Sequence, residues 1–145
     1  MNATILLAEG NEMQRVMMRQ LLEKKLGYSV VMAERGSDVL PALRADSSIG
    51  VVLLDLNMPD MNGFEVMEQM RSEKIATPVI ILTASSEIEK AIRGMRLGAL
   101  DFITKPPDRE RLKTSINNAL RIGTLTDEVA KLRREKSGIL HFDDL

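Results

Sequence analysis

Residues 51–63 read VVLLDLNMPDMNG, and this stretch decides the fold of the chain. Its first four residues are apolar and run without a break into Asp55. A short apolar run that closes in a turn is typical of a strand buried on both faces, as in a parallel sheet. Periodicity alone also allows a buried helix segment, but the β-branched start and the following Pro59 and Gly63 favour a strand. Asp55 is then expected at the carboxyl end of this strand, where open α/β sheets place their ligands.

Four more apolar runs alternate with helical patterns along the chain. The five expected strands are residues 4–8, 28–33, 51–54, 78–82 and 101–104. The helical patterns are residues 11–26, 37–45, 63–71 and 86–98, followed by a last helix that begins near residue 108. This regular alternation predicts an α/β protein with a doubly wound parallel sheet. Right-handed crossovers leave few ways to order the strands.

Short polar patterns predict where three of the helices begin. Asn62 stands just before the apolar start of the third helix and is expected to cap it. Asn11 with Gln14, and Ser86 with Glu89, have the three-residue spacing of a capping box. The first and fourth helices are therefore expected to start at these pairs.

Composition excludes several classes of protein. The chain has 145 residues, 44% of them hydrophobic and 28% charged, which suits one domain with an ample core. There is no cysteine and His141 is the single histidine, so neither a thiolate metal site nor a Ser-His-Asp triad is expected. A net charge of −1 provides no basic field for nucleic acid. Without a membrane-length apolar run or a signal core, we expect a cytoplasmic protein that contacts neither DNA nor a membrane.

Polar residues stand at four of the expected strand ends, and a parallel sheet places these ends at one edge: Glu9, Asp55, Thr83 and Lys105. Taken singly, each has an ordinary explanation as a helix cap, a strand-end hydroxyl or a solvated lysine. Together they indicate phosphoryl transfer. Asp55 would be the nucleophile that forms an acyl phosphate, and Asp55 and Glu9 would hold Mg²⁺. Thr83 and Lys105 would donate to the phosphoryl oxygens.

Three motifs of the chain resemble the receiver domain of two-component response regulators. They are DLNMPDMNG at 55–63, TA at 83–84 and GALDFITKP at 98–106, within a resemblance that covers residues 3–121. The resemblance implies a flavodoxin-like, five-stranded sheet of order 2-1-3-4-5 with an extended C-terminal helix. It also implies a signalling phosphoacceptor rather than an enzyme. A phosphatase of the haloacid-dehalogenase type would need a second acid where Asn57 stands.

The resemblance implies that a sensor histidine kinase donates the phosphoryl group to Asp55. It implies a magnesium site formed by Glu9, Asp55 and the backbone carbonyl of Asn57. Receivers usually carry two adjacent acids after the first strand, whereas this chain has Glu9 followed by Gly10. The missing acid is normally a direct ligand, so we expect weak magnesium binding. The alternative is a degenerate receiver that acts as a phosphorylation-independent dimerisation module.

The resemblance also implies a switch made by Thr83 and Phe102. On phosphorylation Thr83 moves toward Asp55 and the aromatic ring of Phe102 swings inward. These movements would remodel the face formed by the fourth helix, the fifth strand and the fifth helix. The peptide bond between Lys105 and Pro106 is expected to be cis.

The chain is expected to continue beyond a receiver domain of residues 1–121. A heptad pattern predicts a helical, coiled-coil linker over residues 122–138, which would form a homodimer together with the fifth helix; its apolar positions are Ile122, Leu125, Val129 and Leu132. A frayed helical linker is the alternative. Residues 139–145, ILHFDDL, resemble the entry to the ATPase domain of sigma-54-dependent activators of the nitrogen-regulation type. This resemblance predicts a downstream domain.

Overall fold

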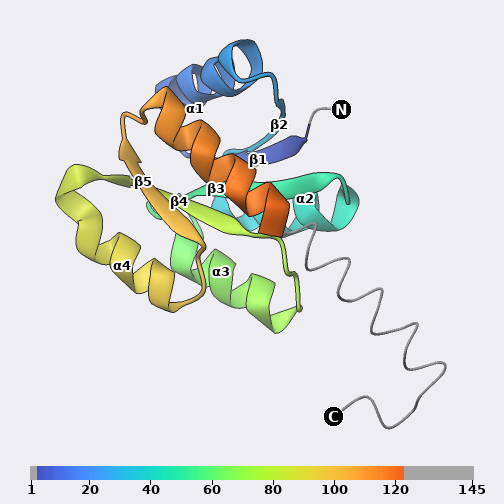
Figure 1. The fold of residues 1–145 in the computed structure, drawn as a ribbon. Coiled ribbons are helices and arrows are strands. Elements are labelled where there is room, and N and C mark those ends of the chain that lie inside the picture. Colours follow the sequence, from blue (N-terminus) through green and yellow to red (C-terminus); the bar gives the residue numbers. More distant parts are fainter. Residues whose placement is uncertain (1–2, 123–145) are drawn as a thin grey trace, which may run out of the picture.

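The computed structural model describes residues 3–122 of the chain. Its centre is one sheet of five parallel strands in the order β2-β1-β3-β4-β5 (Figure 1). The strands are β1 (Thr4–Ala8), β2 (Ser29–Ala33), β3 (Ile49–Asp55), β4 (Val79–Ala84) and β5 (Asp101–Lys105). The predicted α/β class, the doubly wound parallel sheet and the strand order are confirmed.

Helices connect the strands in strict alternation. They are α1 (Glu12–Gln20), α2 (Val39–Ala45), α3 (Gly63–Ser72) and α4 (Ile88–Arg96). A π-helical turn (Leu21–Lys25) extends α1, and 3-10 turns precede α2 (Gly36–Asp38) and α4 (Ser85–Glu87). After β5, a further helix runs over residues 109–122 and is called here the 109–122 helix.

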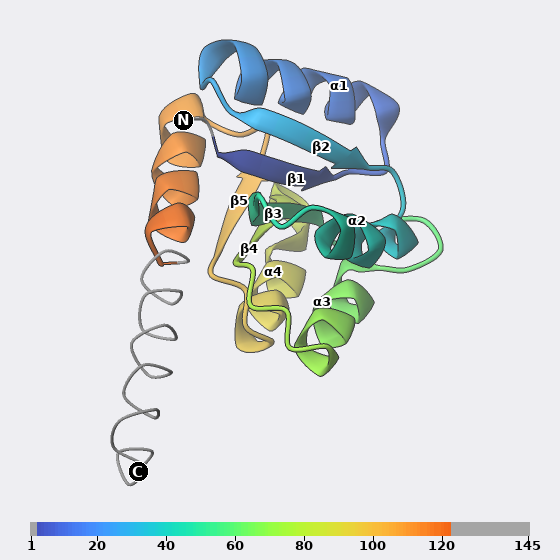
Figure 2. The ribbon, with the colours of Figure 1, turned by 90° about the vertical axis from the view of Figure 1, so that its right-hand side faces the viewer.

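The helices cover both faces of the sheet, as Figure 2 shows for α1 on one side and for α3 and α4 on the other. One apolar cluster joins the sheet to α1 and the 109–122 helix, and a second joins it to α2, α3 and α4. Side chains of β3 contribute alternately to the two clusters, and Val51, Val52, Leu53 and Leu54 are each 0% exposed. The prediction that β3 is buried on both faces is confirmed.

The helix caps predicted from the sequence are present at two helices and absent at a third. The side chains of Asn11 and Asn62 accept hydrogen bonds from the third backbone amide that follows each, at the starts of α1 and α3. The predicted capping box of Ser86 and Glu89 is wrong. A 3-10 turn follows β4, so α4 begins at Ile88 and Glu87 takes the cap position without a side-chain cap bond.

Helix α4 lies close to the sheet because its inner face has small side chains. Ala91 and Gly94 are its buried residues, and a Cβ added at Gly94 would lie only 2.1 Å from Cδ1 of Ile81. Its larger apolar residues face outward: Ile88, Ile92 and Met95 are 36–43% exposed. The apolar face of α4 is thus a surface feature.

The predictions for the linker at 122–138 and for a domain beginning at 139–145 concern residues that lie, apart from Ile122, outside the described part of the chain. Within residues 3–122, no helix has the length and apolar character needed to span a membrane.

Candidate functional site

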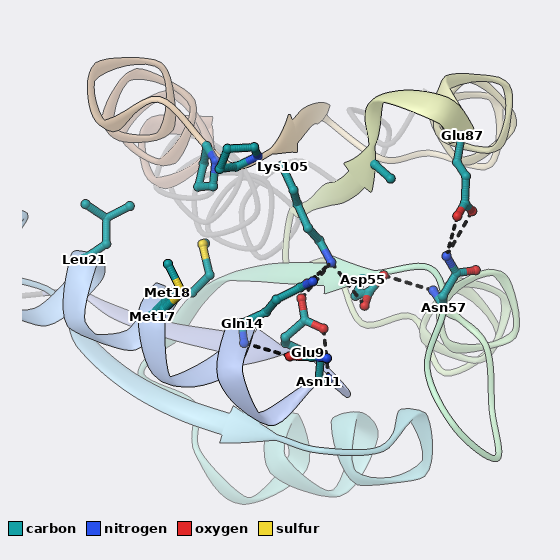
Figure 3. Close-up of a pocket in the computed structure, with 13 residues that line it drawn as sticks. Glu9, Asn11, Gln14, Met17, Met18, Leu21, Asp55, Asn57, Glu87 and Lys105 are labelled. Atoms are coloured by element: carbon teal, nitrogen blue, oxygen red, sulfur yellow. Dashed lines mark hydrogen bonds and ion pairs between the residues drawn. The ribbon is translucent and has the colours of Figure 1, made fainter.

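The carboxyl edge of the sheet brings three of the predicted side chains into contact. Glu9 directly follows β1, Asp55 ends β3 and Lys105 ends β5. The Lys105 ammonium lies 2.7 Å from Oε1 of Glu9 and 3.3 Å from Oδ2 of Asp55 (Figure 3). Its third partner is Oε1 of Gln14 on α1, at 2.8 Å. The fold therefore forms a compact cluster from residues up to 96 positions apart.

The two carboxylates of this cluster are buried, Glu9 being 1% and Asp55 7% exposed. Oε2 of Glu9 accepts from the amide of Asn11 at 3.1 Å, and Oδ1 of Asp55 accepts from the amide of Asn57 at 3.0 Å. Burial, and next the neighbouring Glu9, raise the pKa of Asp55 to about 6, although the Asn57 amide and Lys105 act in the opposite direction. The site therefore carries more buried negative charge than its one lysine neutralises.

Gly10 stands where the resemblance to receiver domains implies a second acid, and neighbouring atoms lie close to it. A Cβ built on Gly10 would lie 2.8 Å from Cδ of Pro59, so any side chain there displaces the loop after β3. Within residues 3–122, no group of three or more acidic, histidine or cysteine side chains is arranged to hold a metal ion. The acidic side chains that Lys105 contacts at this edge are those of Glu9 and Asp55.

The recorded contacts of the two expected switch residues, Thr83 and Phe102, lie outside the acid cluster, which is the group of Glu9, Asp55 and Lys105. Thr83 is 4% exposed, and its hydroxyl lies 3.3 Å from the carbonyls of both Ala84 and Glu87. Phe102 is half-buried and packs against the apolar cluster under α2, α3 and α4. The peptide bond between Lys105 and Pro106 is cis, as expected.

Three residues that the sequence analysis did not assign to the site complete it. Gln14 binds Lys105, and Arg15, which is 8% exposed, donates to the backbone carbonyl of Glu9 at 2.9 Å. Glu87 binds the side-chain amide of Asn57. Gln14 and Arg15 follow the Asn11 cap by one helical turn, and this spacing is the signal that could have found them.

Asp55 lies beside a cavity of about 760 Å³ that extends along α1. The polar wall of the cavity contains the acid cluster, Asn57 and Glu87 (Figure 3). Its opposite part is apolar and is lined by Met17, Met18, Leu21, Pro106 and Pro107. The acid cluster is thus open to an incoming group from one side.

The family model of the response regulator receiver domain matches residues 5–117. The chain is 36% identical over 111 residues to the regulatory protein AtoC of Escherichia coli (strain K12), covering 77% of this chain and 24% of that protein. It is 36% identical over 142 residues to the uncharacterized transcriptional regulatory protein YkoG of Bacillus subtilis (strain 168), covering 97% of this chain and 58% of that protein.

A solved structure agrees with these relatives. The signal receiver domain of a putative LuxO repressor protein from Vibrio parahaemolyticus superposes with a TM-score of 0.78 at 32% identity, covering 89% of this chain and 98% of that one. The chain spans 24% and 58% of the two curated relatives above, so it matches a part of each. The family model matches most of the chain, and the sheet has the strand order that the resemblance implies. The chain therefore belongs to the response regulator receiver domain family.

Proposed function

We propose that Asp55 accepts a phosphoryl group from the phosphohistidine of a sensor histidine kinase. The observation that carries this proposal is the contact of the Lys105 ammonium with both Asp55 and Glu9. An oxygen of Asp55 attacks phosphorus, the bond from phosphorus to the histidine nitrogen breaks, and an acyl phosphate forms. With a pKa of about 6, Asp55 is mostly ionised and able to attack at pH 7.5. Lys105 then neutralises charge on the phosphoryl oxygens.

Receiver domains generally bind Mg²⁺ at this place, and the oxygen donors here fit a hard cation. Glu9, Asp55 and the backbone carbonyl of Asn57 would hold it, and the ion would supply positive charge to the phosphoryl oxygens. Two buried carboxylates beside a single lysine favour such an ion. Both Glu9 oxygens already accept hydrogen bonds from Lys105 and Asn11, and Gly10 adds no ligand, so the affinity is low.

Incubation with acetyl phosphate and Mg²⁺ is expected to add one phosphoryl group to the wild-type chain and none to Asp55→Ala. Intact-mass analysis measures both. Asp60→Asn is the matched control, because Asp60 lies in the same loop at a φ of 63°, which asparagine tolerates. This control should label like wild type. Equal labelling of wild type and Asp55→Ala would place the phosphoacceptor elsewhere.

Gly10→Asp is expected to tighten magnesium binding about tenfold, because it adds a carboxylate to an incomplete ligand set. Gly10→Asn imposes the same contact with Pro59 but adds no charge, so it separates the electrostatic gain from the steric cost. Calorimetric titration with MgCl₂ measures all three proteins. If Gly10→Asp and Gly10→Asn bind Mg²⁺ equally, the missing charge is not what limits affinity.

The phosphorylated domain would signal through α4, β5 and the 109–122 helix. Movement of Thr83 releases its contact with the carbonyl of Glu87 at the start of α4, and Phe102 lies on β5 next to the same helix layer. The exposed apolar residues of α4 supply a surface whose partners would change. In our proposal this controls a downstream ATPase of a sigma-54-dependent, cytoplasmic activator, in which the 109–122 helix and the linker form a homodimer.

A degenerate receiver that works without phosphorylation is the second candidate. It is favoured by Gly10 and by the close approach of Pro59, which leave Glu9 without an adjacent second acid. Asp55 and Lys105 in contact count against it. The acetyl phosphate and magnesium experiments above decide between the two, because a degenerate receiver responds to neither reagent.

A further inference from the structure

Glu87 joins two segments that flank Asp55. Its side chain is 28% exposed and lies at the junction of β4 and α4. Both carboxylate oxygens accept from Nδ2 of Asn57, at 3.0 and 2.9 Å (Figure 3). Nζ of Lys90, one turn along α4, lies 2.8 Å from Oε2 of Glu87 and 3.4 Å from Oδ1 of Asn57. The loop after β3 is thereby tied to the first turn of α4.

The backbone of Glu87 holds a second part of the site. Its carbonyl lies 3.3 Å from the hydroxyl of Thr83, which is 4% exposed. One residue therefore restrains Thr83 through its backbone and Asn57 through its side chain. Since the Glu87 carboxylate makes no cap bond to α4, its position is set by these contacts and by Lys90. We expect a movement of Thr83 toward Asp55 to break the bond to this carbonyl.

The charges around Asp55 indicate how phosphorylation would affect the contacts of Glu87. Asp55 and Glu87 line the same cavity, and Asn57 follows Asp55 by two residues. The charge of the Glu87 carboxylate is paired with the ammonium of Lys90, whose Nζ lies 2.8 Å from Oε2. A phosphoryl group on Asp55 would replace the single carboxylate charge by about two negative charges, a net gain of about one in this cavity. Repulsion between like charges would then act on the start of α4.

We propose that Glu87 is a positioning residue: its bonds to Asn57 and Thr83, here called the Glu87 latch, hold the β4–α4 segment in the unphosphorylated arrangement, and a phosphoryl group opens the latch by repelling the Glu87 carboxylate. This rests on the proposed phosphoacceptor role of Asp55. Because the latch contacts belong to one of two arrangements, they lower the affinity of the site for a phosphoryl group.

The ordinary alternative is a surface ion pair of Glu87 with Lys90, three residues along the helix, with Asn57 as a bystander. Such an exposed pair contributes little to stability and nothing to phosphoryl binding. The two explanations differ in what the removal of Asn57 does. In the latch, Asn57 and Glu87 act through one shared contact, so their effects are not additive.

Titration with beryllium fluoride and Mg²⁺, followed by the backbone amide signals of Thr83 and Phe102, tests the latch. Glu87→Ala and Asn57→Ala are each expected to bind this phosphoryl mimic about three- to tenfold more tightly than wild type. The double variant should bind no more tightly than the tighter single variant. Glu87→Gln, which loses charge but keeps the size, should fall between wild type and Glu87→Ala. Glu89→Ala is the control, an exposed acid two residues along α4.

The latch is rejected if Glu87→Ala binds the mimic like Glu89→Ala, or if the effects of Glu87→Ala and Asn57→Ala simply add. A wild-type chain that neither binds beryllium fluoride nor is labelled by acetyl phosphate would reject the phosphoacceptor role instead. In that case the latch is tested by the amide chemical shifts of the wild type and the variants without ligand. Glu87→Ala and Asn57→Ala should shift the same amide signals within residues 83–96 in the same direction, and shifts confined to each substituted residue's neighbours would reject it.

Discussion

Replacing Lys105 with methionine is expected to lower the free energy of unfolding by about 3 kcal/mol at pH 7.5, the lower end of the range for breaking a buried ion pair. Lys105 is the cation that contacts both Glu9 and Asp55, at 2.7 and 3.3 Å. Methionine keeps the unbranched apolar part of the side chain but leaves the Glu9 carboxylate, 1% exposed, without this cation. The lower end applies because the lysine side chain is 19% exposed.

Urea unfolding at pH 7.5 measures this loss, with Lys113→Met as a control at an exposed lysine of the 109–122 helix. Adding Glu9→Gln to Lys105→Met should restore a large part of the stability, since no uncompensated charge then remains on Glu9. The loss should also shrink toward pH 5, where Asp55 binds a proton. A Lys105→Met variant as stable as Lys113→Met would show that the ion pair does not stabilise the fold.

Asp55→Asn is expected to unfold with a higher free energy than wild type at pH 7.5. The pKa of Asp55 is about 6 in the folded chain against an ordinary 3.8. The folded state therefore holds this proton more tightly, and the stability it contributes is complete below pH 3.8 and lost as the pH rises through 6. Two pKa units correspond to about 3 kcal/mol, which is the upper limit for the gain.

Chemical unfolding of wild type and Asp55→Asn from pH 4 to pH 8 tests this. The difference in the free energy of unfolding between the two proteins should be absent near pH 4 and reach its full size above pH 6. Asp101→Asn supplies a contrast of opposite sign, because hydrogen bonds from Arg111 hold the pKa of Asp101 below its ordinary value. That variant should lose stability at neutral pH. Equal stability of wild type and Asp55→Asn at pH 7.5 would show that burial does not strain the Asp55 carboxylate.

Features fixed by short-range patterns were predictable from the sequence. The uninterrupted apolar run before Asp55 could be satisfied only by burial on both faces, and β3 has that burial. Because parallel strands end at one edge, Glu9 and Lys105 could be placed beside Asp55 although they stand at opposite ends of the domain. Asn11 and Asn62 cap the expected helices because a cap depends on the next three residues.

Features set by contacts between distant residues were not predictable. The start of α4 was misplaced because it depends on a 3-10 turn after β4 and on the bond between Glu87 and Asn57, which are 30 residues apart. Gln14 is an exposed polar residue on a helix, a pattern typical of a solvated face. Its contact with Lys105 spans 91 residues and becomes visible only in the folded chain.

The attachment of the 109–122 helix to β5 has a mechanical consequence. The guanidinium of Arg111 binds both oxygens of Asp101 at 2.8 Å and the carbonyl of Phe102 at 3.0 Å, and Ser115 binds Asp101 from the next turn at 2.7 Å. These bonds fasten β5 to the first half of a helix about 20 Å long, and the buried side chains of Leu112, Ile116 and Ala119 pack the same helix against the sheet. If the helix follows β5 as one rigid body, a tilt of about 10° would carry its far end through roughly 3 to 4 Å. In that case the helix would carry a small movement at Phe102 to residue 122 with a larger amplitude.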